Sequence, residues 1–406
     1  MFYIYILQKN INLCVGDDYL RMEYKYKKGL TKIKRILQNP KNLKYLHQSN
    51  KIKDSGILIV IHESQELGAS ILALHIAKEL MEKEINVYIV SRQFGVLNDK
   101  YNEVAPTQIA LTTNAYRKIC ENLFKKGFRK ALMITASTGD LVKITKESGF
   151  EVVSMIHELD QVIKMLHLED AVKEMIKYSD KVLFSTSIAK EQILRLSNMD
   201  DSKKIVIKPQ GTYFCKPSAE VIKTQNLLLR NDYPRLKNKK IVVGIGNTSE
   251  RKGFDIFLNT ASIMPEYEFV WAGKKENYYD EAIEKYGNPE NFTYVGAMNS
   301  KQLSGIYSIA DVYLMCSRFD TLPSTIFEAL LFETPVVGAK NSGGIVDVIN
   351  DTNGILTENV DCFQFSSAIK KVLVNNYKIK NRDNSFEKYV AYVISLYERL
   401  TIKSQV

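Results

Sequence analysis

The sequence of 406 residues predicts an α/β protein built from two doubly wound domains in tandem. Three observations support this class. Short, near-continuous apolar runs alternate with amphipathic helical patterns, the alternation lapses once near the middle of the chain, and it then restarts with a similar rhythm. Near-continuous apolar strands separated by helices are typical of parallel sheets that are covered on both faces.

The first Rossmann-like domain is expected at residues 56–214. Its strands are predicted at 56–61, 86–91, 131–135, 151–156, 181–185 and 204–208. The segment after the first strand, 70–84, carries apolar residues at helical spacing and predicts a helix. Strands that alternate with helices in this way favour parallel pairing.

Residues 215–239 are polar, contain two prolines and are predicted to connect the two domains. The second Rossmann-like domain is expected at 240–384, with strands at 241–246, 268–272, 292–295, 311–315, 335–339 and 354–356. A last helix is predicted over 385–400. Two open parallel sheets imply a ligand cleft between them, because such sheets bind ligands at the carboxyl ends of their strands.

The charge of the chain is concentrated near its start. Lys plus Arg number 56 and Asp plus Glu number 46, which gives a formal net charge of +10. Residues 24–53 hold ten basic side chains and no acidic one, so they account for the whole excess. The overall basicity therefore does not predict a nucleic-acid partner. Residues 1–53 are predicted to be a basic extension that binds an anionic membrane surface through 24–53; a solvated tail is the alternative.

The composition also limits the compartment and the chemistry. Five scattered cysteines without a C-x-x-C pattern favour a reducing cytoplasm over a zinc site or disulfide framework. No apolar run approaches the ~20 residues of a membrane-spanning helix, and no signal peptide is expected. We expect a cytoplasmic protein that can be peripheral at the inner face of the plasma membrane. A D-x-D motif, a P-loop and G-x-G-x-x-G after the first strand do not occur.

The loop after the first strand of the second domain, 244–255, predicts a phosphate site. Arg251 and Lys252 stand beside Gly253, where a helix is expected to begin. Free N–H groups at a helix N-terminus, supplemented by fixed cations, bind phosphate. The plain alternative is a helix start with two solvated basic side chains.

A second candidate segment spans residues 317–344. Asp320 and Glu328 are separated by seven residues across a predicted strand-to-helix turn, so both can face the strand ends. Carboxylates accept hydrogen bonds from sugar hydroxyls, and N–H groups near Ser324 and Thr325 could hold an anion. Alternatively, Asp320 and Ser324 only cap the helix and Glu328 lies on the surface.

These two segments and the tandem α/β pattern resemble family 4 of the retaining, nucleotide-sugar-dependent glycosyltransferases, which have the GT-B fold. The resemblance spans roughly residues 56–400, and its specific part is 246–344. It implies that Lys252 contacts the donor diphosphate and that Glu328 contacts the ribose. It further implies that Asp320 contacts the transferred sugar, with the main-chain amides of Thr321 and Leu322 near phosphate and sugar.

The first domain adds candidates at two strand ends. Residues 62–70 resemble the family loop that borders the donor phosphates and the acceptor: Gly68 would let the backbone approach the donor, with His62 and Glu63 on the acceptor side. His157 follows another strand, and in the family a histidine of this region faces the reacting centre. The alternative for His157 is a loop residue with local hydrogen bonds.

The sequence departs from the family pattern at two positions. Asp320 stands where a glutamate is usual, and Asn247 stands where an arginine is expected to bind phosphate; Arg251 is the candidate to replace that cation. The resemblance implies a metal-independent hexosyltransferase that needs no cofactor. Its donor would be a nucleoside diphosphate sugar and its acceptor a saccharide or a lipid-linked sugar of cell-surface polysaccharide synthesis. A catalytically silent binding partner and a nucleotide-sugar epimerase are the alternatives.

Overall fold

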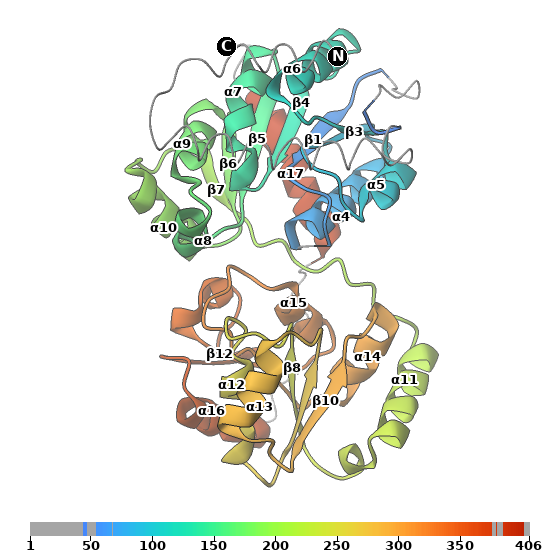
Figure 1. Cartoon of the computed structure of the whole chain (residues 1–406), viewed down its shortest axis with the longest axis vertical. Coiled ribbons are helices and arrows are strands. Elements are labelled where there is room, and N and C mark those ends of the chain that lie inside the picture. The colour runs from blue at the N-terminus through green and yellow to red at the C-terminus, as the bar shows by residue number, and fades with distance from the viewer. Residues whose placement is uncertain (1–43, 47–53, 67, 376–378, 380–384, 402–406) are drawn as a thin grey trace, which may run out of the picture.

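The computed structural model describes residues 44–46, 54–66, 68–375, 379 and 385–401. These residues form two parallel sheets, which lie one above the other in Figure 1 and are flanked by helices. The predicted α/β class with two tandem Rossmann-like domains is therefore confirmed.

The first sheet has the strand order β3-β2-β1-β4-β5-β6-β7, and every described pair in it is parallel. Its strands are β1 (Ile57–Ile61), β2 (Val87–Ser91), β3 (Thr107–Ile109), β4 (Lys130–Ile134), β5 (Glu151–Ile156), β6 (Lys181–Phe184) and β7 (Ile205–Ile207). Its helices are α4 (Gly68–Glu82), α5 (Asn98–Val104), α6 (Thr113–Lys125), α7 (Gly139–Glu147), α8 (Asp160–Met165), α9 (Glu169–Tyr178) and α10 (Ser187–Ser197).

Strand β3 is the element of this sheet that the sequence did not predict. It has three residues, TQI, and lies at the sheet edge beside β2. An edge strand of this length carries no alternation that distinguishes it from a loop.

The second sheet has the strand order β10-β9-β8-β11-β12-β13 and is likewise parallel. Its strands are β8 (Ile241–Ile245), β9 (Glu268–Ala272), β10 (Phe292–Gly296), β11 (Val312–Leu314), β12 (Val336–Ala339) and β13 (Gly354–Thr357). The helices that follow in this half are α12 (Phe254–Ser262), α13 (Tyr278–Tyr286), α14 (Ser300–Ile309), α15 (Ser324–Leu331) and α16 (Cys362–Asn375).

The segment that was predicted as a connection, 215–239, contains a helix of its own. Helix α11 (Ala219–Asp232) packs along α14 of the second domain, and Leu229 is buried there. The polar composition of 215–239 reflects the exposed face of α11, because a surface helix needs only a narrow apolar stripe.

The predicted last helix is present as α17 (Phe386–Thr401), but it does not pack on the domain that precedes it in the sequence. Tyr389, Val390 and Val393 join the buried cluster that α4 forms with β1 and β5 of the first sheet. Figure 1 shows α17 beside α4, among strands of the first domain. The chain therefore crosses between the domains twice.

The two crossing segments lie side by side. Thr212 on the outward crossing pairs with Ser385 on the return in an isolated parallel bridge. The ring of Tyr213 stacks on His75 of α4 with centroids 4.1 Å apart, and it meets Phe386 edge-on at 5.5 Å. Aromatic contacts thus join both crossings to the first domain.

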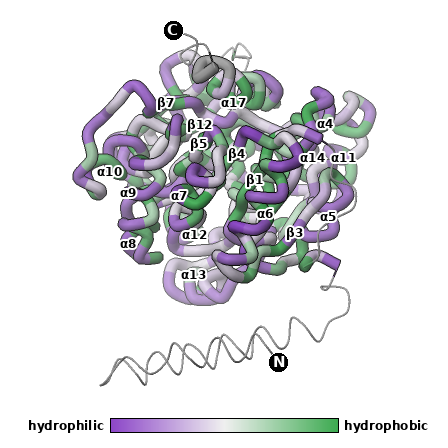
Figure 2. The backbone as a smooth tube through the Cα atoms, turned by 90° about the horizontal axis from the view of Figure 1, so that it is seen from above, coloured by the Kyte–Doolittle hydropathy of each residue, from purple (hydrophilic) through white to green (hydrophobic). Residues whose placement is uncertain are grey.

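Apolar strands fill the middle of each sheet. All five residues of β1, β2 and β9 are buried, as expected for parallel strands covered on both faces. Figure 2 shows hydrophobic positions concentrated along the central strands, with hydrophilic positions on the helices around them. Hydrophobic burial therefore makes the sheets rigid supports for the loops at their ends.

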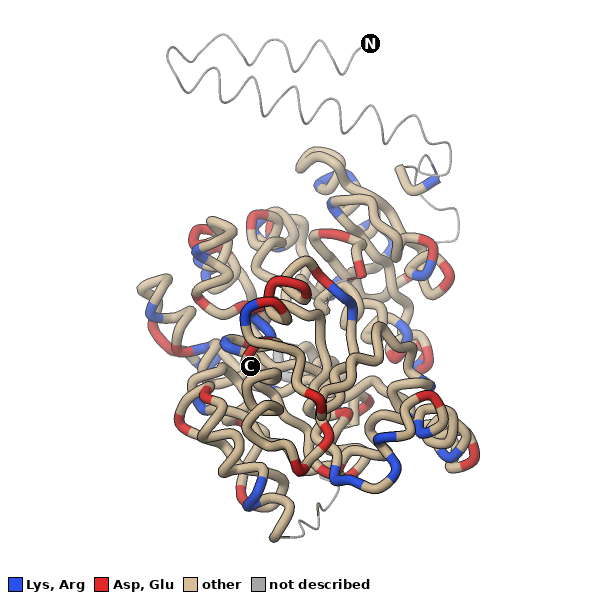
Figure 3. Tube along the Cα trace, turned by 60° about the horizontal axis from the view of Figure 1, so that its bottom comes forward, with Lys and Arg blue, Asp and Glu red and all other residues tan. Residues whose placement is uncertain are grey.

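Residues 44–46, which the sequence analysis assigned to the basic extension, pack on the first domain. Tyr45 is buried, its hydroxyl donates to Asp99 Oδ1 at 2.6 Å, and its carbonyl accepts from the Ile109 N–H at 2.8 Å. The rest of segment 24–53 lies outside the described residues. Acidic and basic positions are interspersed along the described part of the Cα trace (Figure 3). Within the described ranges, no helix is long and apolar enough to cross a bilayer.

Tyr389→Ala should destabilise the first domain although α17 follows the second domain in sequence. Removing this buried aromatic ring should cost about 3–5 kcal/mol. Trp271, the only tryptophan of the chain, lies in β9, so its fluorescence reports on the second domain, while circular dichroism reports on both. Loss of dichroism should precede the Trp271 transition in the variant. The exposed-site control Ala391→Ser should keep the wild-type profile, and an unchanged Tyr389→Ala profile would contradict the assignment.

Candidate functional site

The loops of interest leave each sheet where the strand order reverses. In the second sheet β8 lies between β9 and β11, so the loops after β8 and β11 diverge to opposite sides and leave a crevice. In the first sheet β1 lies between β2 and β4 and gives the same arrangement. The loops after β8 and β11, 246–253 and 315–323, begin at this position and belong to the two candidate segments 244–255 and 317–344.

A glycine lets the two loops of the second domain approach each other. Gly253 precedes α12 with φ +71°, and a Cβ there would lie 1.9 Å from the carbonyl oxygen of Cys316. The Arg318 N–H donates to the Arg251 carbonyl at 2.9 Å. A larger residue at position 253 would push the loops apart, because the left-handed conformation and the close backbone both require glycine.

An ion pair between Arg318 and the buried carboxylate of Asp255 reinforces the same junction. Arg318 donates from both terminal nitrogens to Asp255, at 2.8 and 2.7 Å, and also to the Glu250 carbonyl at 2.6 Å. Asp255 is 1% exposed, in the first turn of α12. This two-point geometry fixes orientation as well as distance, so it holds the loop that carries Arg251 and Lys252.

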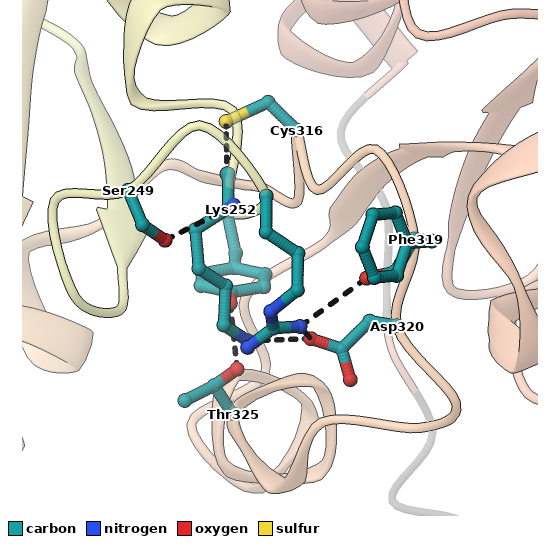
Figure 4. Close-up of polar contacts among 8 residues, drawn as sticks. Ser249, Lys252, Cys316, Phe319, Asp320 and Thr325 are labelled. Atoms are coloured by element: carbon teal, nitrogen blue, oxygen red, sulfur yellow. Dashed lines mark hydrogen bonds and ion pairs between the residues drawn. The ribbon is translucent and has the colours of Figure 1, made fainter. Parts of the chain in front are cut away.

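Lys252, Arg251 and Asp320 form a charge cluster on these loops, and Figure 4 shows Lys252 beside Asp320. Lys252 Nζ lies 2.5 Å from Asp320 Oδ2, and Arg251 donates to the same oxygen at 3.0 Å. Burial alone would raise the pKa of Asp320, but the two cations and their hydrogen bonds outweigh it and hold the pKa below its usual value. Asp320 is therefore ionised at neutral pH and partly neutralises two positive charges.

The charge cluster lines a cavity of about 410 Å³ that both domains enclose. Its second-domain lining residues are Ile245, Gly246, Arg251, Lys252, Asp320, Thr321, Leu322, Pro323, Ser324 and Thr325. Its first-domain and crossing residues are Gly68, Ala69, Leu72, Thr135, His157, Glu158, Ser185, Gln210 and Tyr213. The structure thus brings together nine predicted residues, namely Gly68, His157, Arg251, Lys252, Asp320, Thr321, Leu322, Ser324 and Thr325.

His157 lies at the carboxyl end of β5, where Glu158 holds its backbone. The Glu158 carboxylate accepts the His157 N–H at 2.9 Å and the Ala136 N–H at 3.1 Å. Burial raises the pKa of Glu158, although these two hydrogen bonds oppose the shift. Burial lowers the pKa of His157 to about 4. At neutral pH the imidazole is therefore uncharged and acts as a hydrogen-bonding group rather than a cation.

Three predicted residues do not line this cavity. The Nε2 atom of His62 lies 3.1 Å from the Nε2 atom of Gln93. The backbone carbonyl of Glu63 accepts a hydrogen bond from the Ser70 hydroxyl at 2.9 Å. Glu328 is buried in α15 and accepts the Tyr307 hydroxyl at 2.8 Å. Burial, opposed by hydrogen bonds, raises the pKa of Glu328.

Asn247, which stands where the family pattern has an arginine, directs its side chain to Glu276 rather than to the charge cluster. The Asn247 amide donates to Glu276 Oε1 at 2.8 Å, a residue beyond β9. Arg251, which follows Asn247 in the same loop, lines the cavity instead. The cationic side of the cavity is thus built from two consecutive residues.

The two domains touch directly beside the cavity. Asp347, at the end of the short helix η4 (Gly344–Asp347), accepts the Ser187 hydroxyl at 2.6 Å and the Ser187 N–H at 2.5 Å. Gly344 packs so closely on Thr186 that a Cβ would lie 2.2 Å from its methyl carbon. Phe319 packs against the buried cluster of the first domain. These contacts bring the carboxyl ends of the two sheets together.

Sequence reasoning missed several cavity residues of the first domain. Glu158 and Ser185 follow strands β5 and β6, and Thr135 follows β4 with φ +74°. Such a conformation is strained for a β-branched residue, and strained backbone is frequent at functional sites. Glu158 was adjacent to a candidate and at a strand end, which was the available signal; nothing in the sequence marks the conformation of Thr135.

The sequence is similar to known glycosyltransferases, mainly in its second half. Residues 227–391 match the family described as Glycosyl transferases group 1. The alpha-galactosylglucosyldiacylglycerol synthase of Streptococcus pneumoniae is 26% identical over 230 residues, which cover 53% of this chain and 58% of that protein. The processive diacylglycerol alpha-glucosyltransferase of Acholeplasma laidlawii is 26% identical over 225 residues, 52% of this chain and 62% of that protein. The chain therefore spans less than two thirds of these curated relatives' length.

Solved structures extend the likeness over both domains. The Anabaena protein HepE in complex with UDP superposes with a TM-score of 0.68 and 15% identity, covering 86% of this chain and 99% of HepE. HepE in complex with UDP-glucose superposes with a TM-score of 0.66, over 87% of this chain. The likeness establishes the fold, which is the GT-B arrangement that the sequence predicted.

The low pKa of His157 makes the stability of the protein depend on pH. The folded state takes up a proton only near pH 4, whereas the unfolded state does so near 6.5, so stability is complete above 6.5 and falls as the pH decreases toward 4. His75 shares this direction, because burial also lowers its pKa to about 4. His157→Gln should reduce the slope of unfolding free energy between pH 6.5 and 4 by up to about 1.4 kcal/mol per pH unit. Urea titrations with identical slopes would contradict the buried, neutral imidazole.

Proposed function

From its likeness to glycosyltransferases of the GT-B fold, we propose that this chain transfers a sugar from a nucleoside diphosphate sugar to a saccharide or lipid-linked acceptor. The observation that carries the proposal is the cavity between the domains, which has two cations on one side and a neutral histidine on the other. A diphosphate carries negative charge, whereas a sugar offers only hydroxyl groups. Each side of the cavity thus matches one half of such a donor.

Lys252 and Arg251 would bind the diphosphate and stabilise the charge that develops on it as the bond to the sugar breaks. Both cations are already oriented, because the loop that carries them is held by Arg318 and Asp255. Cations that are already oriented stabilise a leaving group without reorganisation during the reaction. On this basis we propose a transfer that needs no metal ion.

Asp320 would exchange its partners when the donor binds. In the structure its carboxylate pairs with the two cations. A diphosphate carries more charge than one carboxylate, so it would displace Asp320 and leave this side chain to accept hydroxyls of the transferred sugar. Asp320 and His157 would then contact the sugar from opposite domains, with retention of configuration as in family 4.

The remaining donor and acceptor roles are supported more indirectly. Thr321 and Leu322 line the cavity and would offer main-chain amides to phosphate. The space beside the Cα of Gly68 is open, so a ligand could approach the backbone there. The ribose role of Glu328 requires that the donor reach the first turns of α15, next to the cavity residues Ser324 and Thr325. His62 and Glu63 would lie toward the acceptor.

A lipid-linked acceptor is favoured by the names of the relatives. Two of them are described as acting in diacylglycerol glycolipid synthesis. Segment 24–53 would then bring the protein to the inner face of a membrane through its basic residues, and each would add on the order of 1 kcal/mol of attraction. A role in polysaccharide synthesis remains the second possibility for the acceptor.

A catalytically silent binding protein is the competing function. Asn247 faces Glu276 rather than the cavity, and Asp320 already occupies both cations. Turnover of UDP-, GDP-, ADP- and dTDP-sugars, with and without diacylglycerol as acceptor, separates the two functions. An enzyme releases free nucleoside diphosphate, whereas a silent partner binds nucleotide without releasing product.

Removing the charge of Asp320 should affect binding and turnover in opposite directions. Asp320→Asn removes the anion that competes for Lys252 and Arg251, so nucleoside diphosphate should bind about tenfold tighter by calorimetry. Sugar transfer should slow by about a hundredfold, because a group positioned at the reacting sugar is lost. Asp311→Asn is a matched control, since Asp311 pairs with Lys240 just before the same two strands, β11 and β8. Tighter binding by this control, or weaker binding by Asp320→Asn, would contradict the proposal.

Lys252→Ala should weaken binding of nucleoside diphosphate by about ten- to a hundredfold and leave the free nucleoside almost unaffected, because a charged hydrogen bond contributes roughly 1.5–3 kcal/mol. Arg251→Ala should act in the same direction if this residue replaces the cation absent at Asn247. The control Lys240→Ala should leave both affinities unchanged. Equal diphosphate affinity for Lys252→Ala and wild type would remove the phosphate role.

A further inference from the structure

The first-domain wall of the cavity contains two buried polar atoms that have no hydrogen-bond partner within the described part of the chain. One is Nε2 of His157 and the other is Oγ of Ser185. Both residues line the cavity, and Ser185 is 2% exposed. A buried polar atom that loses water without gaining a partner destabilises the fold, so such atoms are uncommon and require an explanation.

The two residues occupy equivalent positions on neighbouring strands. Ile156 and Phe184 are register partners at the ends of β5 and β6, and His157 and Ser185 directly follow them. Adjacent strands lie about 4.8 Å apart, so the two backbones remain close as they leave the sheet. A single small polar group in the cavity can therefore lie within reach of both side chains.

The neighbouring hydroxyl groups are already used by the protein. The Thr186 side chain caps α10 by accepting the Ala189 N–H at 3.2 Å, and the Ser187 hydroxyl donates to Asp347 at 2.6 Å. Inside β5, Ser154 shares a hydrogen bond of 2.6 Å with Ser179. The Ser185 hydroxyl thus differs from the neighbouring hydroxyl groups, because it has no partner among the described residues. Its backbone lies two residues before the hydrogen bond between Ser187 and Asp347, where the domains meet.

We propose that Ser185 binds a sugar hydroxyl beside His157, either on the transferred sugar or on the acceptor sugar. A serine hydroxyl and a neutral imidazole each match a hydroxyl group, which can donate one hydrogen bond and accept another. An apolar group would leave both buried atoms unsatisfied, and the polar groups that a sugar brings to this wall are its hydroxyls. This inference rests on the proposed function, because it requires a sugar in the cavity.

The test compares Ser185→Ala with Ser154→Ala, a buried serine of the adjacent strand whose hydroxyl has a protein partner. Binding of UDP and of UDP-glucose is measured by calorimetry, and melting temperature by calorimetric scanning. Ser185→Ala should keep or raise the melting temperature, since it removes an unpaired buried hydroxyl, and should leave UDP affinity unchanged. Ser154→Ala should lower the melting temperature without altering either affinity.

The measurement that changes in Ser185→Ala shows whether the bound hydroxyl belongs to the transferred sugar or to the acceptor sugar. If Ser185 binds the transferred sugar, Ser185→Ala should weaken UDP-glucose by about three- to tenfold, and the loss should disappear with the deoxyglucose donor that lacks the contacted hydroxyl. If it binds the acceptor, UDP-glucose affinity should stay constant while the KM for glucosyldiacylglycerol rises by a similar factor and that for diacylglycerol does not.

Two negative results have different meanings. Wild-type affinities and KM values in Ser185→Ala, with a wild type that binds UDP-glucose and transfers glucose, would overturn the role of Ser185 and leave the proposed function intact. A wild type that binds no nucleotide sugar of the UDP, GDP, ADP and dTDP series would overturn both.

Discussion

The arrangement of the second domain depends on one residue, Asp320, which is bonded through both its side chain and its backbone. Its carboxylate joins the loop after β8 through Lys252 and Arg251. Its N–H donates to the Ser342 carbonyl at 2.7 Å, and its carbonyl accepts the Gly344 N–H at 3.3 Å. The loops after β8, β11 and β12 therefore meet at Asp320. A movement of one of these loops away from the others would break a hydrogen bond or an ion pair of this residue.

The same residue connects the charge cluster to the first domain. From Gly344 the chain runs through η4 to Asp347, whose carboxylate binds Ser187 at the start of α10. Ser185 and Thr186 directly precede that contact, and Phe319 packs into the first domain beside it. Contacts therefore lead without a gap from the carboxylate of Asp320, beside its two cations, to the start of α10 in the first domain.

The sequence was sufficient for what periodicity and strand ends encode. Twelve of the strands followed from apolar runs, and the cavity residues Lys252, Asp320 and His157 followed from their places after those runs. It was insufficient wherever a partner distant in sequence decides. Strand β3 forms because it pairs with β2, and the position of α17 is set by the core of the first domain. Tyr45 is buried because it forms hydrogen bonds with Asp99 and Ile109. Likewise, Ser185 stands out only because its neighbours have partners and it does not, and no local pattern contains that information.

The placement of α17 also has a consequence for synthesis on the ribosome. The strands of the first sheet are made first, but the helix that covers them next to α4 consists of residues 386–401, which are translated after the strands and helices of the second domain. Domains commonly fold in the order of translation. Here the described strands and helices of the second domain are complete by α16, while the first domain keeps an apolar face uncovered until α17 has been made. The first domain therefore begins folding before the second domain but buries its last apolar face after it.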